Sequence, residues 1–106
     1  MSISIHKRPY EDSVTATVPA SGTQDIVITV PEPILLKSIN ITLGATTTLN
    51  SVKIDNQVIE SATNIDFVSK YGDLVYVQSK VIINVTNGNT TAGEDTTLSV
   101  KGIIYH

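Results

Sequence analysis

Short segments in which apolar and polar residues alternate run along the whole chain. In residues 25–30 and again in residues 81–86, aliphatic side chains recur at every second position. Successive side chains of a strand point to opposite faces of a sheet, so this period indicates strands with a buried face. The chain of 106 residues contains 14 Ile, 14 Thr and 12 Val, whose branched side chains favour strands over helices. No segment keeps the spacing of an amphipathic helix, and the sequence predicts an all-β fold.

Turn-forming residues divide the chain into eight or nine short predicted strands. The turn clusters include Pro19–Gly22 and the longer Asn87–Asp95 segment, which are rich in Pro, Gly and Asn. Short strands at this spacing are typical of an antiparallel β-sandwich. We predict such a sandwich with jelly-roll strand order, and an immunoglobulin-like order remains the alternative because it produces the same alternation. The predicted organisation is an N-terminal strand or docking arm over residues 1–10 and one sandwich domain over residues 11–106.

In two segments, the sequence predicts which sheet face or which cross-strand partner each side chain has. Over residues 35–43, the alternation places Leu35, Ile39, Ile41 and Leu43 on one face, interrupted by Lys37. Between two later strands, a loop of Asn56 and Gln57 sets Ile54 opposite Ile59 and Lys53 opposite Glu60. We prefer this register because it pairs apolar with apolar residues and opposite charges with each other.

Glycine marks two further expected features. Residues 64–69 and 73–78 are predicted strands that flank a turn at residues 70–72, where Gly72 supplies the positive φ of a tight turn. Gly102 interrupts the last predicted strand, residues 97–105, and indicates a bulge or a close approach by another backbone.

Composition and charge exclude several classes of protein. The chain has no Cys, so it has neither a disulfide framework nor a thiolate zinc site. Its net charge is −3 with only 7 basic residues, which argues against nucleic acid as a partner. The N-terminus lacks the features of a signal peptide, and no apolar run approaches the roughly 20 residues of a membrane helix. We expect a protein that is made in the cytoplasm and has no membrane partner.

No arrangement of reactive residues indicates an enzyme. The two histidines, His6 and His106, lie near opposite ends of the chain, and neither has a neighbouring carboxylate that suggests a catalytic base. Neither a Gly-x-Ser-x-Gly elbow nor a phosphate-binding loop occurs. The sequence therefore predicts a protein without catalytic residues, cofactor or metal.

Ligand binding in loops is the second possibility. Asn87, Asn89, Glu94 and Asp95 offer the oxygen atoms that calcium prefers, although the same residues are common in ordinary turns. Tyr71 and Asp73 sit at the predicted turn tip, and Tyr71 is the best candidate for an exposed aromatic ring. Tyr76 is expected to pack on a sheet. A carbohydrate-binding or adhesin-like module would use these residues, with ligand in loops 44–50, 71–73 and 87–95.

Two stretches carry a resemblance to known families. Residues 70–77, with Gly72 and Asp73 leading into a strand, resemble the turn that enters a core strand in many jelly-roll sandwiches. Residues 81–104, a strand, an Asn-Gly-rich loop and a second strand, are similar to the closing hairpin of small phage capsid-decoration and head-fibre proteins. The resemblance implies a virion structural role and carries no functional residue over to this chain.

The surface that composition predicts agrees with an assembly role. Only 16% of the residues are charged, against about 25% in ordinary globular domains. A weakly charged, β-branched exterior is easily buried against other chains. We therefore expect a non-enzymatic protein that decorates or stabilises a capsid, located in the virion, with a shell protein as partner and a homotrimer as its own assembly. The segment with His6, Lys7, Arg8 and Tyr10 is the expected docking contact.

Overall fold

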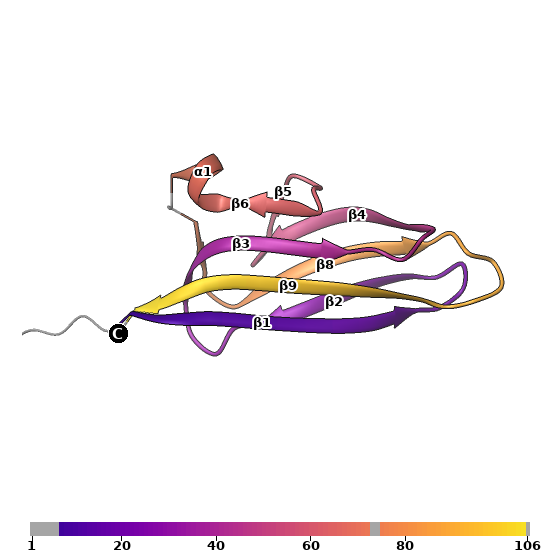
Figure 1. Ribbon diagram of the computed structural model, residues 1–106, viewed down its shortest axis with the longest axis horizontal. Coiled ribbons are helices and arrows are strands. Elements are labelled where there is room, and N and C mark those ends of the chain that lie inside the picture. The colour runs from indigo at the N-terminus through magenta and orange to yellow at the C-terminus, as the bar shows by residue number, and fades with distance from the viewer. Residues whose placement is uncertain (1–6, 73–74, 106) are drawn as a thin grey trace, which may run out of the picture.

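Two antiparallel sheets packed face to face form the protein (Figure 1). The computed structural model describes residues 7–72 and 75–105. The five-stranded sheet has the order β1-β9-β3-β6, and β7 pairs with the same edge of β3 as β6; the four-stranded sheet has the order β2-β8-β4-β5. The strands of the first sheet are β1 (Lys7–Val18), β9 (Glu94–Tyr105), β3 (Ile34–Thr42), β6 (Asn64–Asp66) and β7 (Tyr76–Val77). Those of the second are β2 (Thr23–Thr29), β8 (Lys80–Asn87), β4 (Thr47–Ile54) and β5 (Gln57–Ile59). The predicted all-β sandwich is confirmed.

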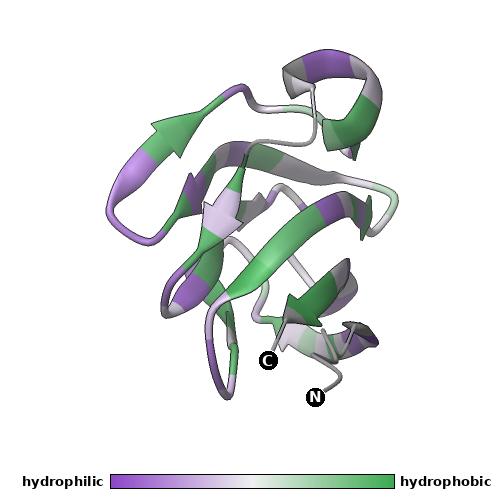
Figure 2. Ribbon diagram, turned by 90° about the vertical axis from the view of Figure 1, so that its left-hand side faces the viewer, coloured by the Kyte–Doolittle hydropathy of each residue, from purple (hydrophilic) through white to green (hydrophobic). Residues whose placement is uncertain are grey.

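The core lies between the sheets and is filled by alternate residues of both. Along β2 and β8, every second side chain is buried, as the alternation predicted. Figure 2 shows the same pattern as apolar and polar segments that alternate along the strands. Burial of these aliphatic side chains is the main favourable contribution to folding. The fully buried residues of largest volume are Phe67, Ile34, Leu36, Ile39, Ile65, Ile83, Leu98, Val18, Val52, Val77, Val81 and Val85.

Strand β1 corrects the predicted division of the chain. The strand runs without interruption from Lys7 to Val18 along β9, so a boundary after residue 10 falls inside it. Pro9 is accommodated because β1 is an edge strand, where one side of the backbone has no neighbouring strand to receive an N–H group. The predicted strand over residues 2–6 lies outside the described residues.

A bulge in β3 makes the predicted facing of its side chains wrong in part. The register against β9 shifts between Leu36 and Ser38, with Lys37 as the extra residue. The shift changes the parity, so Ile34 and Leu36 join Ile39 and Ile41 in the core, while Leu35 is buried outside the main cluster.

Gly102 permits this bulge. A Cβ atom at position 102 would lie 2.6 Å from the carbonyl oxygen of Leu35 in the adjacent strand. The expected close backbone approach is therefore confirmed, and it occurs where Leu36 pairs with Gly102 next to the register shift.

Gly102→Ala is expected to lower the free energy of unfolding by about 1–3 kcal/mol, because the added methyl group overpacks a rigid backbone contact. Denaturation in urea measures the change. Ser99→Ala in the same strand is the matched control, and its change is expected to stay within about 0.5 kcal/mol. An equal loss in both variants would contradict the close-approach explanation.

The β4–β5 hairpin has a different register from the predicted one. Its two-residue turn is Asp55 and Asn56, so Ile54 faces Gln57 and Val52 faces Ile59. The turn forms one residue early because the Asp55 carboxylate is bound elsewhere. Its Oδ1 accepts from the N–H groups of Ser79 at 2.8 Å and Lys80 at 3.2 Å, and its Oδ2 accepts from that of Gln78 at 3.1 Å. The expected pairing of Lys53 with Glu60 is wrong, and Glu60 forms an ion pair with Lys70 instead.

A short helix replaces part of a predicted strand. Strand β6 ends at Asp66, and α1 (Phe67–Tyr71) follows. The Asp66 carboxylate caps the helix by accepting from the N–H groups of Val68 at 3.0 Å and Ser69 at 3.2 Å. Gly72 ends the helix with φ of 62°, so its predicted positive φ is confirmed, although it terminates a helix rather than a hairpin.

Candidate functional site

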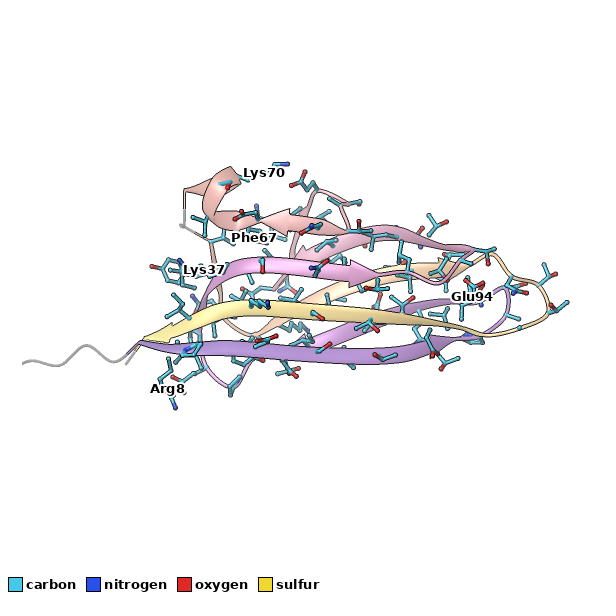
Figure 3. The ribbon with its side chains drawn as sticks, viewed as in Figure 1. Arg8, Lys37, Phe67, Lys70 and Glu94 are labelled. Carbon is cyan, nitrogen blue, oxygen red and sulfur yellow. The ribbon has the colours of Figure 1, made fainter. Side chains whose placement is uncertain are left out.

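Glu94, one of the possible ligand residues of the 87–95 loop, joins the β3–β4 loop to the start of β9. Its Oε1 accepts from the Thr47 hydroxyl at 2.8 Å and from the Thr46 N–H at 2.9 Å, and its Oε2 accepts from the Thr46 hydroxyl at 2.8 Å. Gly44 lies so close that a Cβ there would be 2.6 Å from Oε1 of Glu94. The Thr47 hydroxyl, followed by the Thr46 backbone, holds the pKa of Glu94 below its usual value. The carboxylate acts as a bridge between the β3–β4 loop and the start of β9 (Figure 3).

Asn87 stabilises the same end of the sandwich, near the β3–β4 loop and the start of β9, from a buried position. The side chain is fully buried at the end of β8, and its Nδ2 donates to the carbonyl oxygens of Val18 and Ala92, both at 3.0 Å. Its Oδ1 accepts from the Asn89 N–H at 2.8 Å. Asn89 in turn accepts from the N–H groups of Thr91 and Ala92. The two asparagines therefore shape the β8–β9 loop, which is a role that Asn commonly has in turns.

The predicted loop residues do not form one ligand site. Loops 44–50 and 87–95 lie together, but the oxygens of Glu94, Asn87 and Asn89 bind the protein itself, and Asp95 accepts from the Thr17 hydroxyl at 2.6 Å. Helix α1, which ends next to Gly72, lies at the opposite end of the sandwich (Figure 1). The Tyr71 side chain and Asp73 lie outside the description. Within residues 7–72 and 75–105, no three His, Asp or Glu side chains gather as a metal site.

These bound carboxylates predict that the protein loses stability in acid. Hydrogen bonds lower the pKa of Asp66 and Glu94, and three backbone N–H groups outweigh partial burial to lower that of Asp55. A lowered folded pKa means that the unfolded chain binds protons first as pH falls. The stabilisation is complete above the ordinary values of 3.8 for Asp and 4.5 for Glu, and is lost as pH falls through the lowered values.

Melting temperatures between about pH 7 and pH 2 measure this dependence. Glu94→Gln keeps a side chain of the same shape but cannot titrate, so its melting temperature is expected to fall less steeply over the acid range. A wild-type melting temperature that stays constant down to about pH 3 would contradict the assignment.

The predicted N-terminal docking residues are only partly available. Arg8 lies in β1 with its guanidinium 3.8 Å from the Glu32 carboxylate, and its side chain is exposed. Tyr10 packs against the core, with its hydroxyl 3.4 Å from an Asp12 oxygen. Burial, reinforced by Asp12, raises the pKa of Tyr10. His6 and the Lys7 side chain are outside the description, so of the four predicted docking residues Arg8 alone has a described, exposed side chain.

The outer surface of β2, β8, β4 and β5 carries an apolar row that single-strand patterns do not reveal. Val27 pairs with Ile82, Ile82 with Lys53, and Lys53 with Val58, in one line across the four strands. Val27 is 42% exposed and Val58 is 59% exposed. We call this surface the four-strand face. The sequence signals the outward position of each residue, but only the strand order brings the residues together.

Hydrogen-bonded polar groups lie beside the apolar row on the four-strand face. Asn50 donates to Asn84 Oδ1 at 2.9 Å and to the Thr86 hydroxyl at 2.8 Å, and Asn84 donates to an Asp25 oxygen at 2.8 Å. The Thr23 and Thr86 hydroxyls are 2.8 Å apart. Many polar groups of this face therefore already have partners within the protein.

A cleft of about 670 Å³ lies at the α1 end, between the β4–β5 turn and β7. Ile54, Ile59 and Phe67 form its apolar floor, and Asn56, Gln57 and Tyr76 line its rim. Tyr76 was expected to pack on a sheet, yet it is 52% exposed. The sequence analysis missed this cleft because the unpredicted helix and the shifted hairpin register create it.

Comparison with protein-family models, with curated proteins and with solved structures gives no match.

None of the helices in the described part of the chain has the length and apolar character needed to cross a membrane.

Proposed function

We propose that this chain is a non-enzymatic structural protein of a virus particle, where it decorates or stabilises the capsid. The observation that carries the proposal is the row of the four-strand face in which Val27 pairs with Ile82, and Lys53 separates Ile82 from the exposed Val58. Exposed apolar side chains that gather on one face of a sheet are typical of a surface that another protein covers. In this proposal the four-strand face joins three copies of the chain, and the opposite sheet and the N-terminal segment contact the shell protein.

The polar part of the four-strand face favours burial as well. Covering a polar group is costly when it loses water without gaining a partner. Asn50, Asn84 and Thr86 already bond to each other, so a partner chain can cover them with little loss of hydrogen bonding. Lys53, Lys80 and Asp25 are charged residues of the described strands on the same face. A specific interface buries about 800 Å² per partner, so the proposed trimer contact involves most of the four-strand face.

The strand order supports the same class of protein. Consecutive strands β1 to β4 alternate between the two sheets, and β8 and β9 each insert between two earlier strands. Eight strands arranged as two packed four-stranded sheets are the pattern of the jelly roll, which is common in viral capsid and lectin domains. The strand order therefore supports the proposed jelly-roll fold. It is compatible both with a capsid protein and with the alternative of a carbohydrate-binding module.

Light scattering tests the assembly step. A mass near 34 kDa, three times the 11.4 kDa of one chain, is the expected result. Val27→Lys and Val58→Lys place charges in the apolar row and are expected to yield monomers. Asn40→Lys, on the exposed surface of the other sheet, is the matched control and keeps the trimer. A wild-type monomer at all concentrations would overturn the trimer.

Labelling of virus particles tests the biological assignment. Antibodies against the purified chain, applied to particles from the organism that encodes it, are expected to bind the outside of the shell in a regular array. Mass spectrometry of the same particles is expected to find the chain in fixed proportion to the shell protein. Particles that lack the chain would overturn the virion assignment, whatever its mass in solution.

A further inference from the structure

The cleft beside α1 has walls that are fixed before any ligand arrives. The Asp55 carboxylate accepts three backbone N–H groups from residues 78–80, and its own N–H donates to the Lys80 carbonyl at 2.8 Å. These four bonds lock the tip of the β4–β5 hairpin to the segment that follows β7. Phe67, which is fully buried, supports the floor. A preformed cleft loses little conformational freedom on binding and so favours affinity.

The rim of the cleft offers uncharged groups for hydrogen bonds. Asn56 and Gln57 are exposed, and within residues 7–72 and 75–105 neither side-chain amide has a hydrogen-bond partner. Each amide can donate two hydrogen bonds and accept others. The one carboxylate among the described lining residues is that of Asp55, whose oxygens are already bound to backbone N–H groups. The described lining residues therefore leave no charged group free to attract a charged ligand.

Tyr76 adds an aromatic surface. Its ring lines the cleft with 52% of the residue exposed, next to the apolar side chains of Val75 and Ile59. An exposed ring of this kind presents an apolar face and a hydroxyl group together. Pyranose sugars match that combination, because one face of the sugar consists of C–H groups while its edge carries hydroxyl groups that bond to amides.

We infer that this cleft binds a neutral oligosaccharide of a few residues. One sugar stacks on Tyr76, and the amides of Asn56 and Gln57 bind its hydroxyl groups. The volume of about 670 Å³ lies within the usual range of small-molecule sites, roughly 300–1,000 Å³. The site uses none of the outward-facing residues of the four-strand face. It therefore goes beyond the proposed assembly role, and the two proposals can be tested independently.

Nuclear magnetic resonance on the full-length chain tests the inference, with cellotetraose, maltotetraose and chitotetraose as probes. At least one probe is expected to shift the amide signals of Asn56, Gln57 and Tyr76. Tyr76→Ala is expected to weaken binding about tenfold or more, as truncation of a central aromatic contact commonly does. Tyr76→Phe keeps the ring and is expected to retain affinity within about threefold of wild type.

Two further variants guard against loss of folding and unspecific effects. Gln57→Ala removes one rim amide without touching the ring, and it is expected to weaken binding severalfold while the melting temperature stays unchanged. Val58→Ala, on the four-strand face, is the matched control and leaves affinity at the wild-type value. If none of the three probes shifts any signal, or if Tyr76→Ala and Gln57→Ala both bind like wild type, the inference is wrong.

Discussion

Phe67→Ala is expected to lower the free energy of unfolding by about 3–5 kcal/mol, the range found for truncation of buried aromatic residues. Phe67 is fully buried and is the largest fully buried side chain among the described residues. It joins β6 to α1 and fills the space between the α1 end of the sandwich and the core. Its removal leaves a void that the short helix cannot close. Small domains are stable by only about 5–15 kcal/mol, so the loss is a large fraction of the total.

Denaturation with guanidinium chloride measures this effect, and Val68→Ala is the matched control. Val68 is the next residue of the same helix but is 46% exposed, so its truncation is expected to change stability by less than about 0.5 kcal/mol. Comparable losses in the two variants would mean that the helix as a whole, rather than the buried ring, carries the stability.

Asn87→Ala is expected to lower the free energy of unfolding by roughly 3 kcal/mol, which is the second largest effect that we predict. The Asn87 side chain is fully buried, its bond to the Val18 carbonyl is buried, and its bonds to the Ala92 carbonyl and the Asn89 N–H are part-buried. The variant leaves these three backbone groups without their present partner. Each buried polar group that loses its partner destabilises a protein by about 1–3 kcal/mol, and partial rearrangement of the loop recovers some of this loss.

Hydrogen exchange distinguishes this local role from a general loss of stability. Amides of the β8–β9 loop and of the adjoining end of β1 are expected to exchange faster in Asn87→Ala than the stability change alone requires. Asn40→Ala, an exposed asparagine in β3, is expected to leave both stability and exchange unchanged. Uniform acceleration across the protein would argue against Asn87 as the local anchor.

The alternation of apolar and polar residues predicted the fold class, because each strand with one buried face must show this alternation by itself. It could not predict the bulge at Lys37, since this depends on Gly102 in a strand more than 60 residues away. The hairpin register failed for a similar reason. Local pairing favoured Ile54 opposite Ile59, but the long-range bonds of Asp55 to residues 78–80 moved the turn by one residue. Helix α1, with five residues, is too short for a periodic signal.

The sequence identified polar residues that matter but not what they do. Asn87 and Glu94 were selected for their oxygens, and the structure places both at one end of the molecule. Whether an oxygen is available to a ligand depends on the hydrogen bonds that other loops donate to it. Here Thr46 and Thr47 donate hydrogen bonds to the Glu94 carboxylate. The cleft was not predicted because its residues come from a hairpin, a helix and a strand, and only the whole fold brings these three elements together.

The bonds around Asn87 also bear on how the protein ages. An asparagine followed by glycine is the sequence most prone to spontaneous deamidation, in which the next backbone nitrogen attacks the side-chain amide, and asparagine is among the thermally labile residues. Here the Gly88 N–H donates to the Thr46 carbonyl at 2.9 Å, and the Asn87 amide is held by two carbonyl groups. The attacking nitrogen is therefore directed away from its target. We expect the chemical lifetime of the chain to follow the frequency with which this end of the sandwich opens, so any contact that keeps it closed protects the covalent structure of the chain.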